Sequence, residues 1–573
     1  MRKLLEKLLR RLPLQFRVLY RQFLLRVVDL EALSIQADIV GFLGQFAGVL
    51  IMASVIYAFR AFIYVWDPTA PPAVLLSSAW SAEQSLISTM MLVIGLFAVV
   101  TWDATFPDRR DVMVLSPLPV APRTILFAKV AASGAILGLA VLAFNVASGI
   151  AWPLVLGIPQ GGLPGALQSF AAYWCAMIAA SLFLYCSVLT VQGFTALLLP
   201  RRLFLRLSAI LQLVAFGLFL GVYFMQPSLI TPAALAAPEN QTLLAWSPSF
   251  WFFALFNQMN GTLPAAFSWL ALRAWVSLGA VVAGAVASLL LCYLRTMKRT
   301  VEEPDLTPAA RGSHWAPPLG TALETAIVLF SIRSLARSRQ HRLAYAFYLA
   351  IVFGIALSLL GSELSAAGPR PLSIDLIMST FMMMTFAVLG LRGVFSLPIS
   401  LTANWVLRTT QIFPSEKYIA ATGRALFFLA VLPVAFLSAL LSLPFRPFAL
   451  VAAHLAILVL LGCILTEISL VGFYKVPFTC SYLPGKVNVQ LAFWAFFVVF
   501  LPIALAGAGF ELNVLRHPLQ IFFLAIFLVA ALRGLRAFIR HRAQSAVLYF
   551  EELPPEVITT LGLISNYSSD PGN

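Results

Sequence analysis

Ionisable side chains inside apolar segments are the first candidates for chemistry in this chain. An ionised group in membrane hydrocarbon is costly unless it is paired or hydrated, so such residues usually serve a function. The candidates are Glu467, His454 thirteen residues before it, and Asp103 near the inner end of another segment. Proton coupling ordinarily requires more buried carboxylates than these. An ion pair of Glu467 with Lys475, or plain solvent exposure, is the simpler interpretation.

Motifs typical of enzymes are scarce. Gly485-Lys486 is followed by Val487 and lacks the earlier glycine of a phosphate-binding loop, so we expect no ATP site within the chain. No two histidines have the i, i+4 spacing of a helical zinc site, and the five cysteines form no CxxC motif. We therefore expect no metal, no cofactor and no catalytic residue. A membrane hydrolase with Ser, His and carboxylate on different helices stays an alternative.

Long apolar runs recur along the whole chain, in which 61% of the residues are hydrophobic. A helix of about 20 apolar residues crosses a bilayer, and lipid tolerates only helices or closed barrels, whose strands would be shorter and alternating. The predicted fold class is all-α, a polytopic membrane bundle of about 12 transmembrane helices. These predicted spans lie near 41–63, 84–104, 128–152, 168–198, 207–226, 274–294, 343–361, 373–395, 420–442, 447–473, 490–509 and 519–539.

Basic residues alternate across this ladder of segments. Only five of the 38 Lys and Arg residues are expected at the outer side, which places both termini in the cytoplasm and the protein in the inner membrane of the cell. These five are Arg60, Arg273, Arg370, Arg446 and Arg516. The net charge of +15 is spread over helix ends rather than one groove, so nucleic acid is not expected. The lipid bilayer, with its anionic inner leaflet, is the expected partner.

The layout suggests two halves, 1–296 and 323–550, joined by a polar linker at 297–322 and followed by a flexible tail at 551–573. Each half begins with an amphipathic basic stretch, marked by Leu19 and Phe23 in the first and by Ile327 and Leu335 in the second. Two spans later each half has an inner loop with a Leu-Pro pair. Because each half has six predicted spans, both have the same orientation and form two parallel six-helix repeats. Chance is the alternative, since Leu-Pro pairs are common in membrane loops.

This layout resembles the permease of type-2 ATP-binding-cassette exporters. In that family each unit has an interfacial helix, six spans and a loop between spans two and three that contacts the ATPase subunit. The matching first loop spans 108–119, followed by Arg123 and Lys129. The family often has an outer re-entrant segment before the last span; 227–262 could supply it, and a capped outer loop is the alternative.

The resemblance implies a cytoplasmic ATPase subunit, in two copies, as the partner, with ATP and Mg bound by that subunit. It assigns coupling roles to two sets of loop residues: Asp108, Arg109, Arg110, Asp111, Pro119 and Arg123 in the first loop, and Arg392, Pro398, Arg408 and Glu416 in the second. The predicted function is a permease that moves a substrate across or out of the membrane and is not itself an enzyme. An ion-gradient-driven secondary transporter is the alternative, followed by a membrane-embedded enzyme or scaffold.

Overall fold

The fold is described by a computed structural model of the chain. It describes residues 13–28, 39–66, 72–102, 113–115, 117–225, 237, 240–302, 320–365, 368, 370–399, 416–479, 499–544 and 548. Helices dominate these residues, and the strands found among them are the two-residue segments β1 (Arg370–Pro371) and β2 (Phe445–Arg446), which pair in parallel. The predicted all-α class is confirmed.

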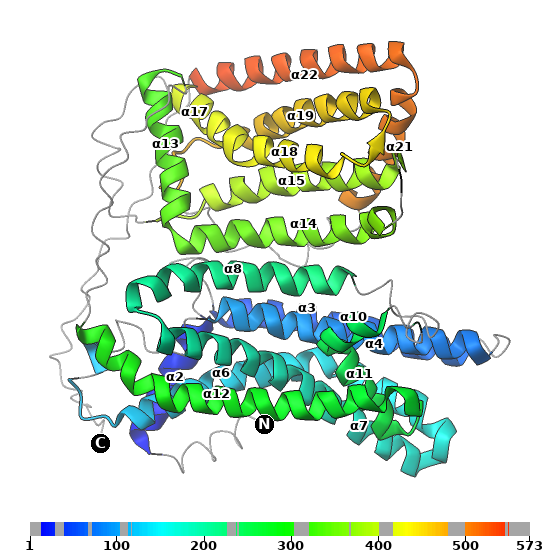
Figure 1. The fold of residues 1–573 in the computed structure, drawn as a ribbon. Helices are drawn as coiled ribbons and strands as arrows, with labels where there is room; N and C mark the ends of the chain where they lie inside the picture. Colours follow the sequence, from blue (N-terminus) through cyan, green and yellow to red (C-terminus); the bar gives the residue numbers. More distant parts are fainter. Residues whose placement is uncertain are drawn as a thin grey trace, which may run out of the picture.

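The helices form two groups, one above the other in Figure 1. The lower group comprises α2 (Leu14–Val28), α3 (Ile39–Trp66), α4 (Pro72–Val100), α6 (Pro122–Asn145), α7 (Ser148–Leu198), α8 (Arg201–Met225), α10 (Gln241–Trp246), α11 (Pro248–Asn260), the 3-10 turn η3 (Ala265–Phe267) and α12 (Ser268–Glu302). The upper group comprises α13 (Ala322–Arg337), α14 (Arg339–Ser365), α15 (Ile374–Phe395), α17 (Glu416–Leu426), the π-helix η5 (Phe427–Val431), α18 (Leu432–Leu441), α19 (Phe448–Leu470), α21 (Leu501–Leu515) and α22 (Pro518–Gln544).

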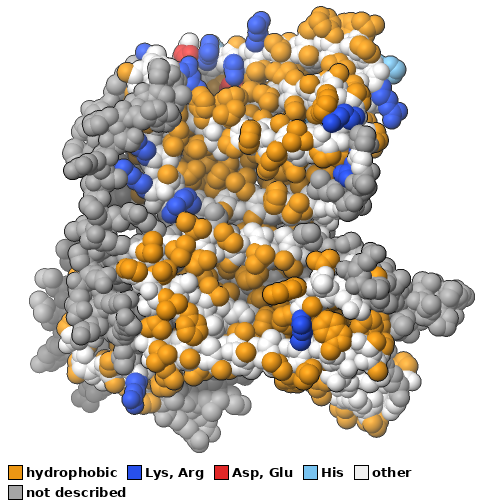
Figure 2. All heavy atoms as spheres, viewed as in Figure 1, with side chains coloured by type: hydrophobic (Ala, Val, Ile, Leu, Met, Phe, Trp, Pro, Cys, Tyr) orange, Lys and Arg blue, Asp and Glu red, His pale blue; other side chains and the backbone are white. Residues whose placement is uncertain are grey.

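Nine helices in the described part of the chain are long and apolar enough to cross a membrane. They lie at 79–100, 122–145, 161–198, 265–291, 341–361, 374–395, 416–441, 448–470 and 518–544. Shorter apolar helices occur at 46–62, 148–159, 210–224 and 501–515. Figure 2 shows hydrophobic side chains covering much of the visible flank of both groups, as expected for helices that face lipid. The count of twelve spans and the internal repeat stay predictions.

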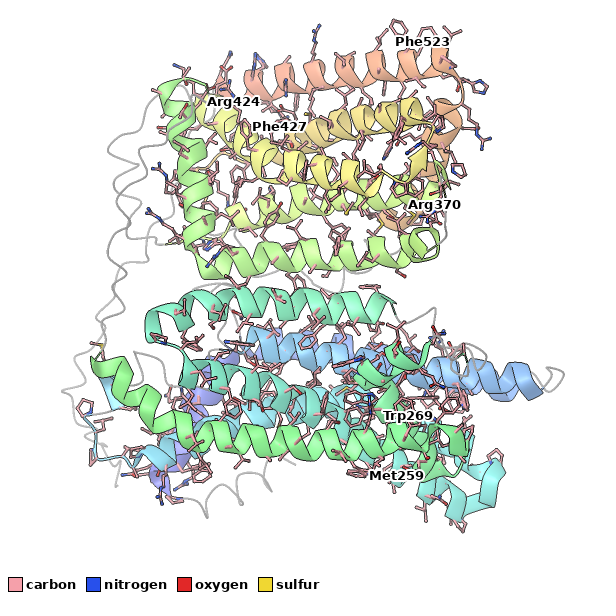
Figure 3. The ribbon with its side chains drawn as sticks, in the orientation of Figure 1. Met259, Trp269, Arg370, Arg424, Phe427 and Phe523 are labelled. Carbon is pink, nitrogen blue, oxygen red and sulfur yellow. The ribbon has the colours of Figure 1, made fainter. Side chains whose placement is uncertain are left out.

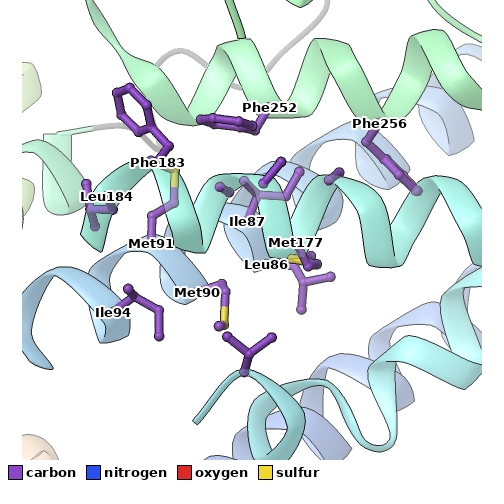
Figure 4. Packing of buried hydrophobic residues seen from close by; sticks show 14 of the residues in the cluster. Leu86, Ile87, Met90, Met91, Ile94, Met177, Phe183, Leu184, Phe252 and Phe256 are labelled. Carbon is purple, nitrogen blue, oxygen red and sulfur yellow. The ribbon is translucent and has the colours of Figure 1, made fainter. Parts of the chain in front are cut away.

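Each group has its own apolar core. In the lower group, Met90 and Met91 of α4 pack near Met177 and Phe183 of α7 and Phe252 of α11 (Figure 4). A separate cluster fills the upper group between α14, α15, α19 and α21. Two cores of this kind allow the groups to behave as separate bodies.

Helix α7 is bent at a pair of glycines. Gly161 and Gly162 leave the helical conformation, and Gly162 has a φ of 61°. The two arms then lie against each other, since a Cβ on Gly157 would be 2.4 Å from the Cα of Ala166. Before this bend, α6 ends at Asn145 and α7 begins at Ser148, so the predicted third span near 128–152 is divided between two helices.

The two groups meet where α8 lies beside α14 (Figure 1). The contact is apolar: Phe216 and Leu220 of α8 are buried, and the Phe216 ring lies 5.3 Å from the Phe347 ring, centroid to centroid. Gly354 of α14 faces Phe224 so closely that a Cβ would be 2.4 Å from the Phe224 ring. This helix pair, with Val99 of α4 buried in the same cluster, therefore helps to set how closely the groups approach.

Replacement of Gly354 by Val is expected to force α8 away from α14, because the added side chain overlaps Phe224. Overpacking of this kind typically costs about 1–3 kcal/mol. The matched control is Gly361→Val on the same helix, where a Cβ would meet no atom within 4 Å. Thermal unfolding of the purified variants in detergent measures the effect. Equal loss of stability in both variants would contradict the assignment.

Candidate functional site

The helices α2 and α13 lie at the same end of the molecule, which we call the interfacial-helix end (left in Figure 1). In the lower group, α2 packs on the start of α6, where Leu19 and Phe23 are buried against Ile125. The Lys129 ammonium lies 5.2 Å from the centroid of the Phe23 ring. The Gln15 side chain also donates a hydrogen bond to the Pro119 carbonyl, 3.5 Å away. An amphipathic helix is thus attached to the predicted coupling loop.

The loop before α6 presents apolar side chains to solvent. Residues 113–115 form one helical turn, on which Met113 and Val114 are each 64% exposed; Leu118 follows and is 48% exposed. These residues lie between two predicted spans rather than within one, so lipid does not cover them in the predicted topology. Neighbouring apolar side chains exposed to water are typical of a protein contact surface.

The upper group has a similar corner, by which we mean the junction of an amphipathic helix with the helix that follows a Leu-Pro loop. Helix α13 runs across the ends of its neighbours (Figure 1) and packs on α17, with Ile327 buried against Tyr418. The α13 N-terminus has a full capping box: Thr321 accepts a hydrogen bond from the Glu324 backbone, and Glu324 accepts one from the Thr321 backbone. Arg424 of α17 then binds Glu324 at 3.0 Å, and Figure 3 shows Arg424 at this end.

The electrostatics of this corner favour an ionised Glu324. Burial raises the pKa of this carboxyl, but hydrogen bonds from Thr321 and the positive charges of Arg424 and Lys417 outweigh burial, so that the net pKa is lowered from its usual value. The Glu324 carboxylate therefore joins α13 to α17 at neutral pH.

Several predicted coupling residues lie outside the described residues: Asp108, Arg109, Arg110, Asp111 and Arg408. The intramembrane candidate Asp103 lies outside them as well. Among the others, Pro119 and Arg123 are exposed at the first corner, and Pro398 is half-buried in the second loop. The two remaining coupling candidates of the second half, Arg392 and Glu416, contact neighbouring helices.

Arg392 donates to the Ser469 carbonyl at the end of α19, 3.1 Å away, and its guanidinium lies over the Phe473 ring. Glu416 lies 3.7 Å from Arg540 of α22. These contacts connect the end of α15 to α19 and the start of α17 to α22. Both residues thus link helices at the interfacial-helix end.

Glu467 and His454 lie at different ends of α19, about 20 Å apart along the axis. Glu467 forms an ion pair of 2.7 Å with Arg536 of α22, so the partner is Arg536 rather than Lys475. An ion pair was the simpler sequence-based interpretation, and an ion pair is found. Sequence spacing pointed to Lys475 because it lies two turns away on the same chain segment, whereas Arg536 is brought in by packing of α22.

His454 occupies a buried polar cluster that the sequence did not reveal. Its Nδ1 lies 2.8 Å from the Glu511 carboxyl of α21, and its Nε2 lies 3.0 Å from the Thr380 hydroxyl of α15. Thr380 and His454 have no exposed surface, and Glu511 is buried. The predicted span at 490–509 ended before Glu511 and so placed it in an outer loop. The only sign of this cluster in the sequence was a single Glu near the end of an apolar run.

A second carboxylate is buried in the lower group. Glu83 of α4 accepts a hydrogen bond of 3.0 Å from the amide of Asn257 on α11, and Asn257 in turn accepts one from Thr262. A cavity of about 10 Å³ lies between Glu83 and Tyr173, close to the smallest volume that holds one water molecule. The predicted span at 84–104 excluded Glu83 by one residue.

The Thr380–His454–Glu511 arrangement has the residue types of a nucleophile, a base and an acid. The Thr380 hydroxyl nevertheless lies within 2.9 Å of the Leu376 and Ile377 carbonyls and has no exposed surface, so a substrate has no route to it. Among the described residues, no group of three or more His, Cys, Asp and Glu side chains could hold a metal ion.

Comparison with protein-family models, with curated proteins and with solved structures found no match.

Replacement of Glu324 by Gln is expected to weaken the α13–α17 contact at neutral pH. A carboxyl whose folded-state pKa is lowered stabilises the fold above its unfolded value of 4.5, and that contribution disappears as pH falls through the lower folded value. The wild type and Glu324→Gln should therefore converge in acid. Thermal unfolding from neutral pH to about pH 3 measures this.

The control for that experiment is Thr321→Ser, which keeps the capping oxygen and should follow the wild type. A difference between wild type and Glu324→Gln that is constant at every pH would show that the charge is not involved.

Proposed function

We propose that this chain is the membrane-spanning permease of an ATP-driven exporter, with the ATPase in a separate cytoplasmic subunit. The observation that carries this proposal is the pair of similar corners at the interfacial-helix end. In each corner an amphipathic helix packs on the start of the helix that follows a Leu-Pro loop: α2 on α6, and α13 on α17. Two corners suit two ATPase copies.

The corners have the contacts required to transmit force. In the first, the loop is joined to α2 through Gln15 and Pro119, and α2 is joined to α6 through Phe23 and Lys129. In the second, Glu324 and Arg424 join α13 to α17. A push on the first loop would therefore move α2 and α6 together, and a push on the start of α17 would move α13 with it.

The first loop also offers a surface for a partner. Met113, Val114 and Leu118 are exposed apolar side chains outside the predicted spans. An ATPase that covered them would gain about 25 cal/mol for each Å² of apolar surface removed from water. Because the sequence contains no phosphate-binding loop, ATP and Mg would be bound by this partner. The interfacial-helix end would then face the cytoplasm, in the inner membrane.

A gradient-driven secondary transporter is the second candidate, and a specific observation favours it. The apolar runs of the sequence contain too few carboxylates for proton coupling, but Glu83 and Glu511 are both buried within the helical groups. In this alternative the corners would stabilise the fold rather than receive force from an ATPase.

Purification of the tagged chain in mild detergent, followed by mass spectrometry and an ATPase assay, tests the proposal. A soluble ATPase in about two copies per chain is the expected result, in keeping with the two corners. Reproducible purification without any ATPase would exclude the exporter and leave the secondary transporter.

The double replacement Met113→Asp and Val114→Asp is expected to abolish copurification of the ATPase, because two charges would enter an apolar contact. The matched control is Leu443→Asp, which alters a 58% exposed residue at the opposite end of the molecule and should leave copurification unchanged. Gel filtration of both variants confirms that each is folded. Retention of the ATPase by the double variant would place the contact elsewhere.

A further inference from the structure

The buried cluster of Thr380, His454 and Glu511 forms one continuous hydrogen-bonded chain across α15, α19 and α21. Each residue lies one to two turns from the end of its helix, at the end of the molecule opposite α13. In the described part of the chain, the imidazole has Thr380 and Glu511 as its hydrogen-bond partners. Around them the core is apolar, with Ile377, Leu458 and Ala508 buried in the same cluster.

The three side chains have hydrogen-bond partners for each other both with one proton more and with one proton fewer. When the Thr380 hydroxyl donates to the Leu376 or Ile377 carbonyl, its oxygen accepts from Nε2 of His454, and one proton is shared between Nδ1 and Glu511. The His454–Glu511 pair then has no net charge. When that proton leaves, Nδ1–H donates to the Glu511 carboxylate, the proton on Nε2 is gone, and the Thr380 hydroxyl rotates to donate to Nε2. The pair then has a net charge of −1.

Burial makes the free energies of these two protonation states unequal. A net charge in an apolar environment is costly, whereas a neutral pair with all its hydrogen bonds made is not. Hydration of the negatively charged state would require water to reach Glu511. About 9% of the Glu511 side chain is exposed, and fuller hydration of the carboxylate would require α21 to move away from α15 and α19.

Other charged groups near this end belong to the surrounding elements: Asp375 on α15, Glu363 on α14, Arg370 and Arg446 on the two strands, and Arg516 and His517 between α21 and α22. Glu363 accepts a hydrogen bond from Ser373, and Arg446 donates to the Leu443 and Phe445 carbonyls. Among the described residues, the ion-pair contact of Glu511 is with His454. The basic residues of α22 lie at its other end.

We propose that Thr380, His454 and Glu511 form a binding site for one exchangeable proton, and that release of this proton requires α21 to separate from α15 and α19. The site is independent of the ATPase proposed above, and it functions equally in a gradient-driven transporter. A missing ATPase would leave it intact.

The test compares the full-length wild type with Glu511→Gln, in which the amide retains the hydrogen bond to His454 but cannot ionise. Well above pH 6.5, His and Glu side chains of an unfolded chain have both lost their titratable protons. If the proposed site keeps its proton, the folded wild type binds one proton more than the unfolded chain. The equilibrium constant for unfolding of the wild type should therefore rise by up to about tenfold per pH unit, which means that its stability falls as pH rises. Glu511→Gln should lack this slope. Subtraction of the stability–pH curve of Glu511→Gln from that of the wild type removes the contribution of all other titrating groups.

Hydrogen–deuterium exchange provides a second readout, measured on α21 peptides and corrected for the intrinsic pH dependence of exchange. Exchange of α21 in the wild type should increase at alkaline pH, whereas α21 in Glu511→Gln should stay protected. The control variant Glu467→Gln alters a carboxylate that is paired with Arg536 at the other end of α19, and it should follow the wild type.

A wild type without the slope, or a Glu511→Gln variant that retains the full slope, would overturn the proposal. If Glu511→Gln does not fold, the wild type and Glu467→Gln decide the question by themselves. Alkaline opening of α21 in both supports the site, and α21 protection that does not change with pH in either excludes it.

Discussion

The cost of an unpaired polar group among apolar side chains is the constraint on which the rest of this structure depends. At the end of α4, two glutamines from neighbouring helices complete the backbone hydrogen bonding: Gln212 of α8 donates to the Val99 carbonyl at 2.6 Å, and Gln192 of α7 donates to the Trp102 carbonyl. Trp102 donates in turn to Ser208 of α8, 2.9 Å away. These contacts fix α4 between α7 and α8 by hydrogen bonds rather than by packing alone. Polar residues inside the groups therefore specify which helices are neighbours.

The same constraint explains what could be predicted from the sequence and what could not. Long apolar runs reveal helices because their lengths are imposed by the membrane, and the interfacial helices were predicted because Leu19, Phe23, Ile327 and Leu335 recur at helical spacing. The buried carboxylates were missed because span ends are poorly marked. Glu83 falls one residue before a predicted span and Glu511 two residues after another. Their partners, Asn257 and His454, are 174 and 57 residues away, a separation that only tertiary packing spans.

The ion pair of Glu467 illustrates a different limit. Local spacing offered Lys475, but Arg536 comes from α22, 69 residues away. From sequence spacing, candidate partners can be identified only along the same stretch of chain. Contacts between helices depend on which faces pack, and an apolar helix such as α22 gives few signs of its orientation. The proposed proton site could not be predicted from the sequence for the same reason, because its three residues come from three helices.

The contacts of α15 and α19 indicate which elements could move. These two helices are joined near one end by Thr380 and His454, 3.0 Å apart, and near the other end by Arg392 and the Ser469 carbonyl, 3.1 Å apart. Between these points Gly462 of α19 is packed against Met384 of α15. Helices joined along their whole length move as one body, so a motion at either end of the upper group is transmitted to the other. Helix α21 has its polar link to that body through Glu511 alone among these contacts, and that link is the one whose charge can change. With the proposed proton site, the upper group would therefore combine a rigid pair of helices with a third helix, α21, whose attachment depends on a proton.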